Sequence, residues 1–329
     1  MPLALAVFAA LFLLVIASDA FTNAVEWVGA SLRLTRSAVG AVVAAIGSSV
    51  PDIIVTVIAL VFLHDEASTS IGIGAVIGAP LMLATVVLCL VGLMALGMRS
   101  NEPILNMPAG AATIGLGLFA LTFALVIAAS FTRSHAAHVI ASVGVIGAYI
   151  AYLCYHFRSG LVESEDRPPG LRLTPRASKP APAMIALQLA LALAVTIAAS
   201  RWFISSVTSA SSAIGLPPFV VSVILTPIAA EMPEAVNVLI WMRRGLDELA
   251  FGNVLGAMMF QTSIASAVAM LYTPWVLGRD AYAAASATLA AAIVVLMSVI
   301  VLRRVDARAL AACGIFYFAY LVSLIAMKA

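Results

Sequence analysis

Long apolar stretches alternate with short polar ones along almost the whole chain. A membrane-crossing helix needs roughly 17–25 mainly apolar residues, and ten stretches meet this length. They cover residues 3–30, 37–62, 70–97, 104–130, 136–157, 183–213, 217–242, 248–271, 281–302 and 308–327. This pattern predicts an all-α polytopic membrane protein with about ten transmembrane helices.

The one long polar stretch divides these spans into five and five. It reads RSGLVESEDRPPGLRLTPRASKPAP, and its prolines and charges predict a linker. The sequence therefore predicts three parts: a first five-helix repeat at 1–157, a polar cytoplasmic linker at 158–182 and a second five-helix repeat at 183–329.

The two sets of spans carry similar motifs in the same order. AVVAAIGSSVPDIIVTVIALVF (41–62) aligns with VSVILTPIAAEMPEAVNVLIWM (221–242), so that a proline-acid pair falls on a proline-acid pair; GAVIG (74–78) then matches GNVLG (252–256). Because five is an odd number of spans, the second copy must be inverted in the membrane. Inverted repeats with helices broken at the midplane are typical of transporters, whose substrate site lies between the repeats.

Composition and charge agree with a membrane location. The chain is 64% hydrophobic and 10% charged, whereas soluble domains carry about 25% charged residues. The net charge of +2 gives no reason to expect nucleic acid, and the three cysteines are too far apart for a disulfide or metal motif. The first apolar run lacks the basic start of a signal peptide, so we expect a retained helix.

The distribution of basic residues predicts the orientation. If the N-terminus lies outside, 13 of the 17 Lys and Arg residues fall in inner loops. We therefore expect both termini outside the plasma (inner) membrane. The sequence does not set the oligomeric state, and function as a monomer is the expectation.

Three acids lie near the middle of predicted spans. Asp52 falls in the second span, and Glu231 and Glu234 fall three residues apart in the seventh. A charge at a helix centre costs at least about 2.5–3.5 kcal/mol, so such residues are functional candidates. No Lys or Arg lies at a comparable depth in the second, third, seventh or eighth span. Three close carboxylates therefore need a multivalent cation or protons.

Further oxygen ligands surround the acids in the sequence. Proline supplies no N–H, so Pro51 and Pro233 leave the carbonyls of Gly47 and Ala229 without their helical partners. The hydroxyls of Ser48 and Ser49 and the neutral amide of Asn253 complete the candidate set. Gln261 lies two turns further along, where its side chain need not face the acids, and it is not among the candidates. These ligands are all oxygens, which suit calcium because it accepts six to eight of them in flexible geometry. Magnesium is less favoured, because it loses its bound water molecules reluctantly. With no His or Cys placed beside the acids, zinc and copper are disfavoured.

The motifs resemble those of the cation/calcium exchanger superfamily. GSSVPD (47–52) and AAEMPE (229–234) are similar to its two alpha-repeat motifs, Gly-Thr/Ser-Ser-x-Pro-Glu/Asp; GNVLGAMMF (252–260) resembles the later part of the second, and ASDAFTNAVEWVGASL (17–32) the first helix of prokaryotic sodium/calcium exchangers. The resemblance implies two inverted five-helix repeats and alternating access. It implies an antiporter that exchanges calcium for sodium or protons, with no cofactor and no enzymatic activity.

The resemblance also implies roles for individual residues. The calcium acids fall on Asp52 and Glu234, and the carbonyl-donating positions fall on Ser48 and Ala230. A hydroxyl ligand falls on Ser49. An amide or acid ligand of the eighth span falls on Asn253.

Departures from the family pattern put sodium coupling in doubt. Ala229, Ala230 and Glu231 stand where the pattern has Gly, Thr/Ser and Ser, and further neutral ligands are replaced by Ala75, Ala79-Pro80 and Ala257-Met258. The neutral ligands contribute to sodium sites in the family. We therefore hypothesise that the additional acid, Glu231, makes exchange at least partly proton-coupled.

Other functions remain open at this point. A proton-coupled antiporter for manganese or magnesium would use the same ligands. A cation channel would need a continuous pore, and an intramembrane aspartic protease would need its acids on neighbouring helices. Asp19 and Arg201 fall at equivalent positions of the two repeats, either as an ion pair or near the outer water boundary.

Overall fold

The computed structural model describes residues 3–31, 45–63, 65–98, 103–158, 169–177, 179–215 and 217–326. Eight helices within these ranges are long and apolar enough to cross a membrane. A shorter apolar helix and a broken one supply the second and seventh spans. The all-α fold class with about ten spans is therefore confirmed, while residues 37–44 of the second predicted span lie outside the described part of the chain.

The first half of the chain contains five spans in sequence order. Its third span is one long helix with a π-helical turn, η3, in its middle. The elements are α1 (Leu3–Ser31), α3 (Ala45–Val57) with η2 (Ile58–Leu63), α4 (Glu66–Met82) with η3 (Leu83–Val87) and α5 (Leu88–Met98), β1 (Ile104–Leu105), α6 (Ala109–Ala129) and α7 (His135–Arg158).

The second half repeats this order with the opposite orientation. Its second span is divided into two helices, and its third again contains a π-helical turn, η4. The elements are α8 (Pro182–Ile214), α9 (Pro218–Ala230) with α10 (Met232–Arg243), α11 (Asp247–Phe260) with η4 (Gln261–Ala265) and α12 (Ser266–Tyr272), α13 (Arg279–Leu302), β2 (Val305–Asp306) and α14 (Ala307–Ala326).

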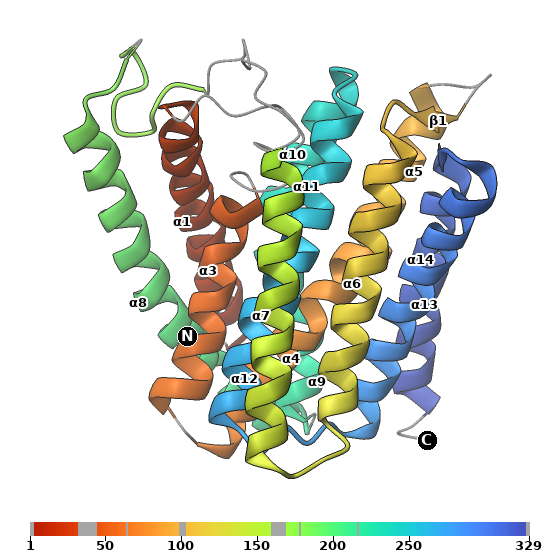
Figure 1. Ribbon diagram of the computed structural model, residues 1–329. Coiled ribbons are helices and arrows are strands. Elements are labelled where there is room, and N and C mark those ends of the chain that lie inside the picture. Colours follow the sequence, from red (N-terminus) through yellow and green to blue (C-terminus); the bar gives the residue numbers. More distant parts are fainter. Residues whose placement is uncertain are drawn as a thin grey trace.

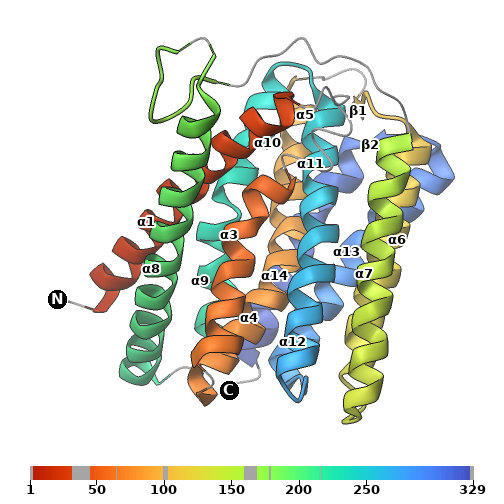
Figure 2. The ribbon, with the colours of Figure 1, turned by 60° about the vertical axis from the view of Figure 1, so that its left-hand side comes forward.

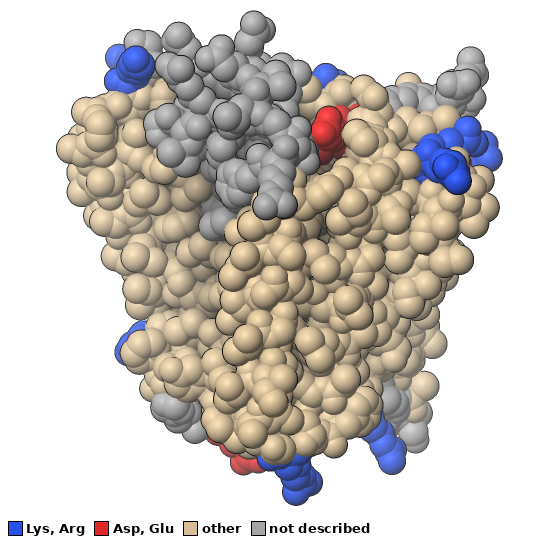
Figure 3. Space-filling view, viewed as in Figure 1, with Lys and Arg blue, Asp and Glu red and all other residues tan. Residues whose placement is uncertain are grey.

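The helices stand side by side, with α1 and α8 forming a pair at one edge (Figures 1 and 2). This pair shares a small hydrophobic cluster with α3, whereas most of the other helices share a second, larger cluster. Charged side chains lie mainly at the upper and lower margins of the face in Figure 3, and a broad belt between them is almost free of charge. This is the surface expected of a protein that crosses a bilayer.

Helices from opposite halves pack closely around the centre. In α4, an added Cβ on Gly74 would lie 3.0 Å from Ser222 Cβ, and one on Gly78 would lie 2.7 Å from Pro227 Cγ, both on α9. Gly78 also faces the Val223 carbonyl, which loses its helical partner because Pro227 has no N–H. The glycines thus allow α4 to press against α9, as small residues do between membrane helices.

The described part of the linker is attached to α1 and α8. Arg172 forms a bidentate ion pair with Asp19, at 2.8 and 2.9 Å. The buried side chains of Asn23 and Gln188 bind each other and the linker backbone. Asp19 therefore pairs with the linker, which the sequence did not reveal, rather than with Arg201, which is exposed on α8.

Candidate cation site

Three carboxyl groups from the two halves meet at the centre of the molecule. Asp52 lies on α3, Glu231 lies between α9 and α10, and Glu234 lies in the first turn of α10. One oxygen of each group lies within 4.8 Å of the others. Two oxygens that bind one calcium ion at about 2.4 Å each can be up to about 4.8 Å apart. The three acids are therefore close enough to hold a single ion.

A helix break in the second half places two of these acids. Glu231 has φ −86° and ψ 2°, between the end of α9 at Ala230 and the start of α10 at Met232. These angles lie in the bridge region of backbone space, outside regular helix. Glu231 and Glu234 are 1% and 0% exposed. The break turns both carboxyl groups into the interior.

The first half reaches the site without such a break in its described part. α3 is continuous from Ala45 through Val57. The side chains of Gly47, Ser48, Ala229 and Ala230 lie outside the described set, and the ligand roles expected of these residues stay predictions.

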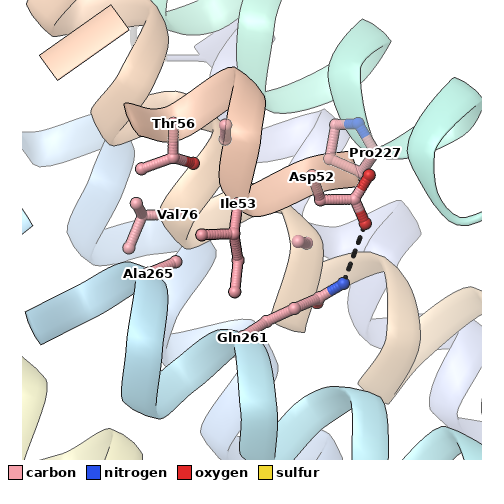
Figure 4. A pocket seen from close by; sticks show the side chains of 9 residues that line it. Asp52, Ile53, Thr56, Val76, Pro227, Gln261 and Ala265 are labelled. Atoms are coloured by element: carbon pink, nitrogen blue, oxygen red, sulfur yellow. Dashed lines mark hydrogen bonds between the residues drawn. The ribbon is translucent and has the colours of Figure 1, made fainter. Parts of the chain in front are cut away.

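Each acid is contacted by a side chain from the opposite half. Ser49 Oγ donates to Glu234 Oε1 at 3.2 Å. Gln261 Nε2 donates to Asp52 Oδ2 at 3.0 Å, and Figure 4 shows this second bond as a dashed line. The same Gln261 nitrogen donates to Glu231 Oε1 at 2.8 Å. The carboxyl groups of Asp52 and Glu231 are also within hydrogen-bonding reach of each other. Gln261 thus joins the acids of the two halves.

The sequence emphasised Asn253 rather than Gln261. Asn253 is fully buried on α11, but neither amide atom has a hydrogen-bond partner within the described part of the chain. Gln261 begins the π-helical turn η4, whose wider backbone changes the direction of its side chains relative to a regular helix. The available signal was a second amide in the same span, eight residues after Asn253, and α-helical spacing gave no reason to turn it toward the acids.

A small pocket adjoins Asp52 and Gln261 (Figure 4). Its other lining side chains are mainly apolar and include Ile53, Val76 and Pro227. Ala75 and Ala79, two positions where the family pattern has neutral polar ligands, also line it. Methyl groups cannot bind a cation, so this side of the site offers few neutral oxygens.

Within the part of the chain that the structure describes, the helices around the site place no Lys or Arg beside the acids. The residues that form α3, α9, α10, α11, η4 and α12 include a single basic side chain, Arg243, at the far end of α10. Ionised carboxylates this close together repel each other strongly in a low-dielectric interior. Their charge must be balanced by a bound cation, by protons or by both in turn.

Comparisons with known proteins agree with this geometry. The family described as "Sodium/calcium exchanger protein" matches residues 2–158 and 184–328. A curated protein of Alkalimonas amylolytica, named as an antiporter, CaxA, is 24% identical over 290 residues, which are 85% of each chain.

Two kinds of solved structure share the fold. The crystal structure of the H+/Ca2+ exchanger CAX superimposes with a TM-score of 0.78 at 14% identity, covering 99% of this chain and 82% of that one. A structure of the sodium-calcium exchanger NCX_Mj gives a TM-score of 0.64 at 18% identity, covering 98% of both chains. At these identities the likeness establishes the fold.

Proposed function

Since this chain belongs to the sodium/calcium exchanger protein family, we propose that it is a secondary active antiporter that exchanges calcium for protons by alternating access. The observation that carries the proposal is the cluster of Asp52, Glu231 and Glu234, drawn from both halves of the molecule. A site shared by two inverted halves can face either side of the membrane when one half moves against the other.

The cargo follows from the ligands. The acids supply several carboxylate oxygens, and the Ser49 hydroxyl and the Gln261 amide lie against them. Gly47, Ser48, Ala229, Ala230 and Asn253 remain further proposed donors. Calcium accepts six to eight oxygens in variable geometry, whereas magnesium requires a near-ideal octahedron. Calcium is therefore the first choice, and manganese and magnesium are the alternatives that the test must include.

The counter-ion follows from charge balance. A calcium ion compensates two of the three negative charges, so the acids need protons whenever calcium leaves. Glu231 supports this assignment because it adds a carboxyl group beside Asp52, while Ala75 and Ala79 remove neutral ligands from the adjoining pocket. Protons and calcium then compete for the same oxygens. The protein changes access from one side of the membrane to the other more readily when calcium or protons balance the charge of the acids than when the acids are ionised and empty.

The same reasoning extends to orientation and to catalysis. The described linker, β1 and β2 lie at one end of the molecule (Figures 1 and 2), and the basic inner loops of the sequence include these segments. We assign this end to the cytoplasm and both termini to the outside of the plasma membrane, with the monomer as transporter. We assign no enzymatic role to the acids, because the Gln261 amide already engages Asp52 and Glu231.

Ion fluxes in proteoliposomes test the proposal. Calcium uptake is measured with an imposed pH gradient, an imposed sodium gradient or neither, and with manganese or magnesium as competitors. The proposal predicts uptake driven by the pH gradient and inhibited weakly by magnesium. Uptake that follows the sodium gradient fully and the pH gradient not at all would refute proton coupling. Protein-free liposomes with the same gradients control for leak.

A further inference from the structure

The helix formed by α11, η4 and α12 contains hydroxyl groups that differ from most others in the membrane region. Thr262, Ser263 and Ser266 are 0% exposed, yet none of their hydroxyls has a hydrogen-bond partner in the described ranges. Elsewhere, twelve Ser and Thr hydroxyls donate to the carbonyl four residues earlier: those of Thr85, Thr113, Thr122, Ser142, Thr196, Ser200, Thr208, Ser209, Ser212, Thr273, Ser286 and Thr288.

The neighbouring helix α7 carries polar atoms with the same property. The hydroxyls of Tyr149 and Tyr152 and Nδ1 of His156 are buried and lack partners within the part of the chain described. These rings form a ladder: Tyr149 and Tyr152 have centroids 6.4 Å apart, and Tyr152 and His156 have centroids 4.5 Å apart.

The helices that carry these two sets of polar atoms pack against each other. α7 packs against η4 and α12, and the Tyr149 ring lies 5.5 Å from that of Phe260, the residue before η4. Further out, Ser142 Oγ lies 3.5 Å from the Ala267 carbonyl. We call this contact the polar seam and define it by Tyr149, Tyr152, His156, Thr262, Ser263 and Ser266.

Water is the physical answer to such a cluster. Buried polar atoms in native proteins are almost always satisfied, by protein or by ordered water. An internal water needs two to four polar partners, and the seam supplies donors and acceptors on both sides. It has no carboxylate, so it lacks the charged ligands with which a divalent ion replaces its hydration shell.

The seam joins the cation site at η4. Gln261, Thr262 and Ser263 are consecutive residues of η4, which packs against α7, so the buried hydroxyls of Thr262 and Ser263 directly follow the amide that contacts the acids. At the other end, His156 lies two residues before the last residue of α7, Arg158. The polar atoms therefore extend from the end of α7 that leads into the linker to the acid pair of Asp52 and Glu231.

We propose that the polar seam holds a file of internal water and carries protons between the linker end of α7 and the cation site, apart from the path of the cation. The proposal rests on the proton coupling proposed above. In each step a water or hydroxyl oxygen accepts one proton from a neighbour and releases another to the next, so one proton moves along the file and no group changes its net charge.

The first experiment tests for the water itself and does not depend on transport. X-ray hydroxyl-radical footprinting of the purified protein labels side chains that touch bound water. We expect Tyr149 and Tyr152 to be modified much faster than Phe119 and Phe123, which are equally buried on α6. Equal, low rates for all four rings would overturn the proposal.

The second experiment tests for proton transfer. In the double variant Tyr149→Phe, Tyr152→Phe, we expect proton-driven calcium uptake to be at least about tenfold slower, because two hydroxyls and their hydrogen bonds are lost from the path, with an unchanged half-saturating calcium concentration. Tyr320→Phe is the control, because it removes another buried hydroxyl that has no partner among the described residues, from α14 outside the seam.

The outcomes separate the two proposals. If the wild-type protein shows no proton-driven uptake, the proposed function fails, and footprinting still decides whether the seam holds water. If uptake is proton-driven and the double variant matches wild type, the seam does not carry the protons and the inference is wrong. An equal slowing by Tyr320→Phe would also contradict it.

Discussion

The two halves of the molecule place equivalent helices around the site but equip them with different side chains. Three residues before its proline-linked acid, the first half has Ser49 and the second has Glu231. Each half also has two glycines four residues apart, Gly74 and Gly78 in the first half and Gly252 and Gly256 in the second. Nine residues after the first of these glycines, each half begins a π-helical turn, at Leu83 and at Gln261.

The features that the halves share are those of the backbone. Both keep the paired glycines and the π-helical turn, because close packing of helices requires small residues at fixed places. The side chains that bind ions are free to differ. The first half supplies an acid and a hydroxyl, and the second supplies two acids and an amide. Symmetry thus accounts for the scaffold, and the chemistry of the site depends on where symmetry is absent.

The largest effect is expected from removing either of the symmetric acids. Asp52→Asn and Glu234→Gln should each lower calcium uptake roughly 100-fold. Each change removes one charged ligand of the bound calcium ion, and the loss of a charged partner from a buried ion costs about 3 kcal/mol or more. Asp65→Asn, at an exposed acid outside the site, is the control. If either variant kept the wild-type rate, the site would not be shared by both halves.

A smaller effect is expected at the amide. Gln261→Leu introduces the residue that the first half has at the equivalent place, and it removes the donor that Asp52 and Glu231 share. Leaving buried polar groups without a donor costs about 1–3 kcal/mol, so the half-saturating calcium concentration should rise roughly tenfold.

Leu83→Met is the matched control for the amide variant, at the same place in the other half. Equal calcium affinities in Gln261→Leu and wild type would show that the amide has no part in the site.

The packing between halves can be tested without transport. Gly78→Ala would place a Cβ 2.7 Å from Pro227 Cγ and 2.8 Å from the Val223 carbonyl oxygen, and overpacking of this kind costs about 1–3 kcal/mol. The midpoint of thermal unfolding in detergent should fall. Gly117→Ala, where nothing lies within 4 Å, should leave it unchanged or raise it, and equal midpoints would contradict the packing argument.

The smallest effect concerns how the two long central helices begin. α4 is capped by Asp65, which accepts a 2.9 Å bond from Ser68 N, whereas α11 follows Leu246, which has no capping side chain. The bonds from Ser68 lower the pKa of the Asp65 carboxyl below its usual range. The capping contribution is therefore complete above the unfolded pKa of about 3.9, and it is lost as the pH falls through the folded value.

For the variant Asp65→Ala we expect a loss of stability of about 1 kcal/mol at neutral pH. The difference from wild type should shrink below about pH 4. Unfolding curves at neutral and acid pH measure it, and a difference that did not change with pH would refute the role of the ionised cap.

The sequence predicted those features that follow from the bilayer and from the repeat. The lengths of the apolar stretches gave the ten spans, because the membrane thickness sets helix length. The paired motifs gave Asp52 and Glu234 as partners, and the structure brings their carboxyl groups together.

Contacts that depend on local backbone geometry were not predictable. The contact of Gln261 with the acids depends on a π-helical turn, and the spacing of apolar residues along the chain does not predict such a turn. The pairing of Asp19 with Arg172 depends on how a polar linker folds back onto α1, and spacing along the chain does not determine that.

The most direct test of proton coupling through Glu231 is the simultaneous measurement of calcium and proton fluxes in proteoliposomes containing Glu231→Ser. This change gives both halves a serine at the same place. We predict that calcium uptake will then no longer respond to a pH gradient, while calcium still binds. Proton-driven uptake at the wild-type rate in this variant would contradict the account.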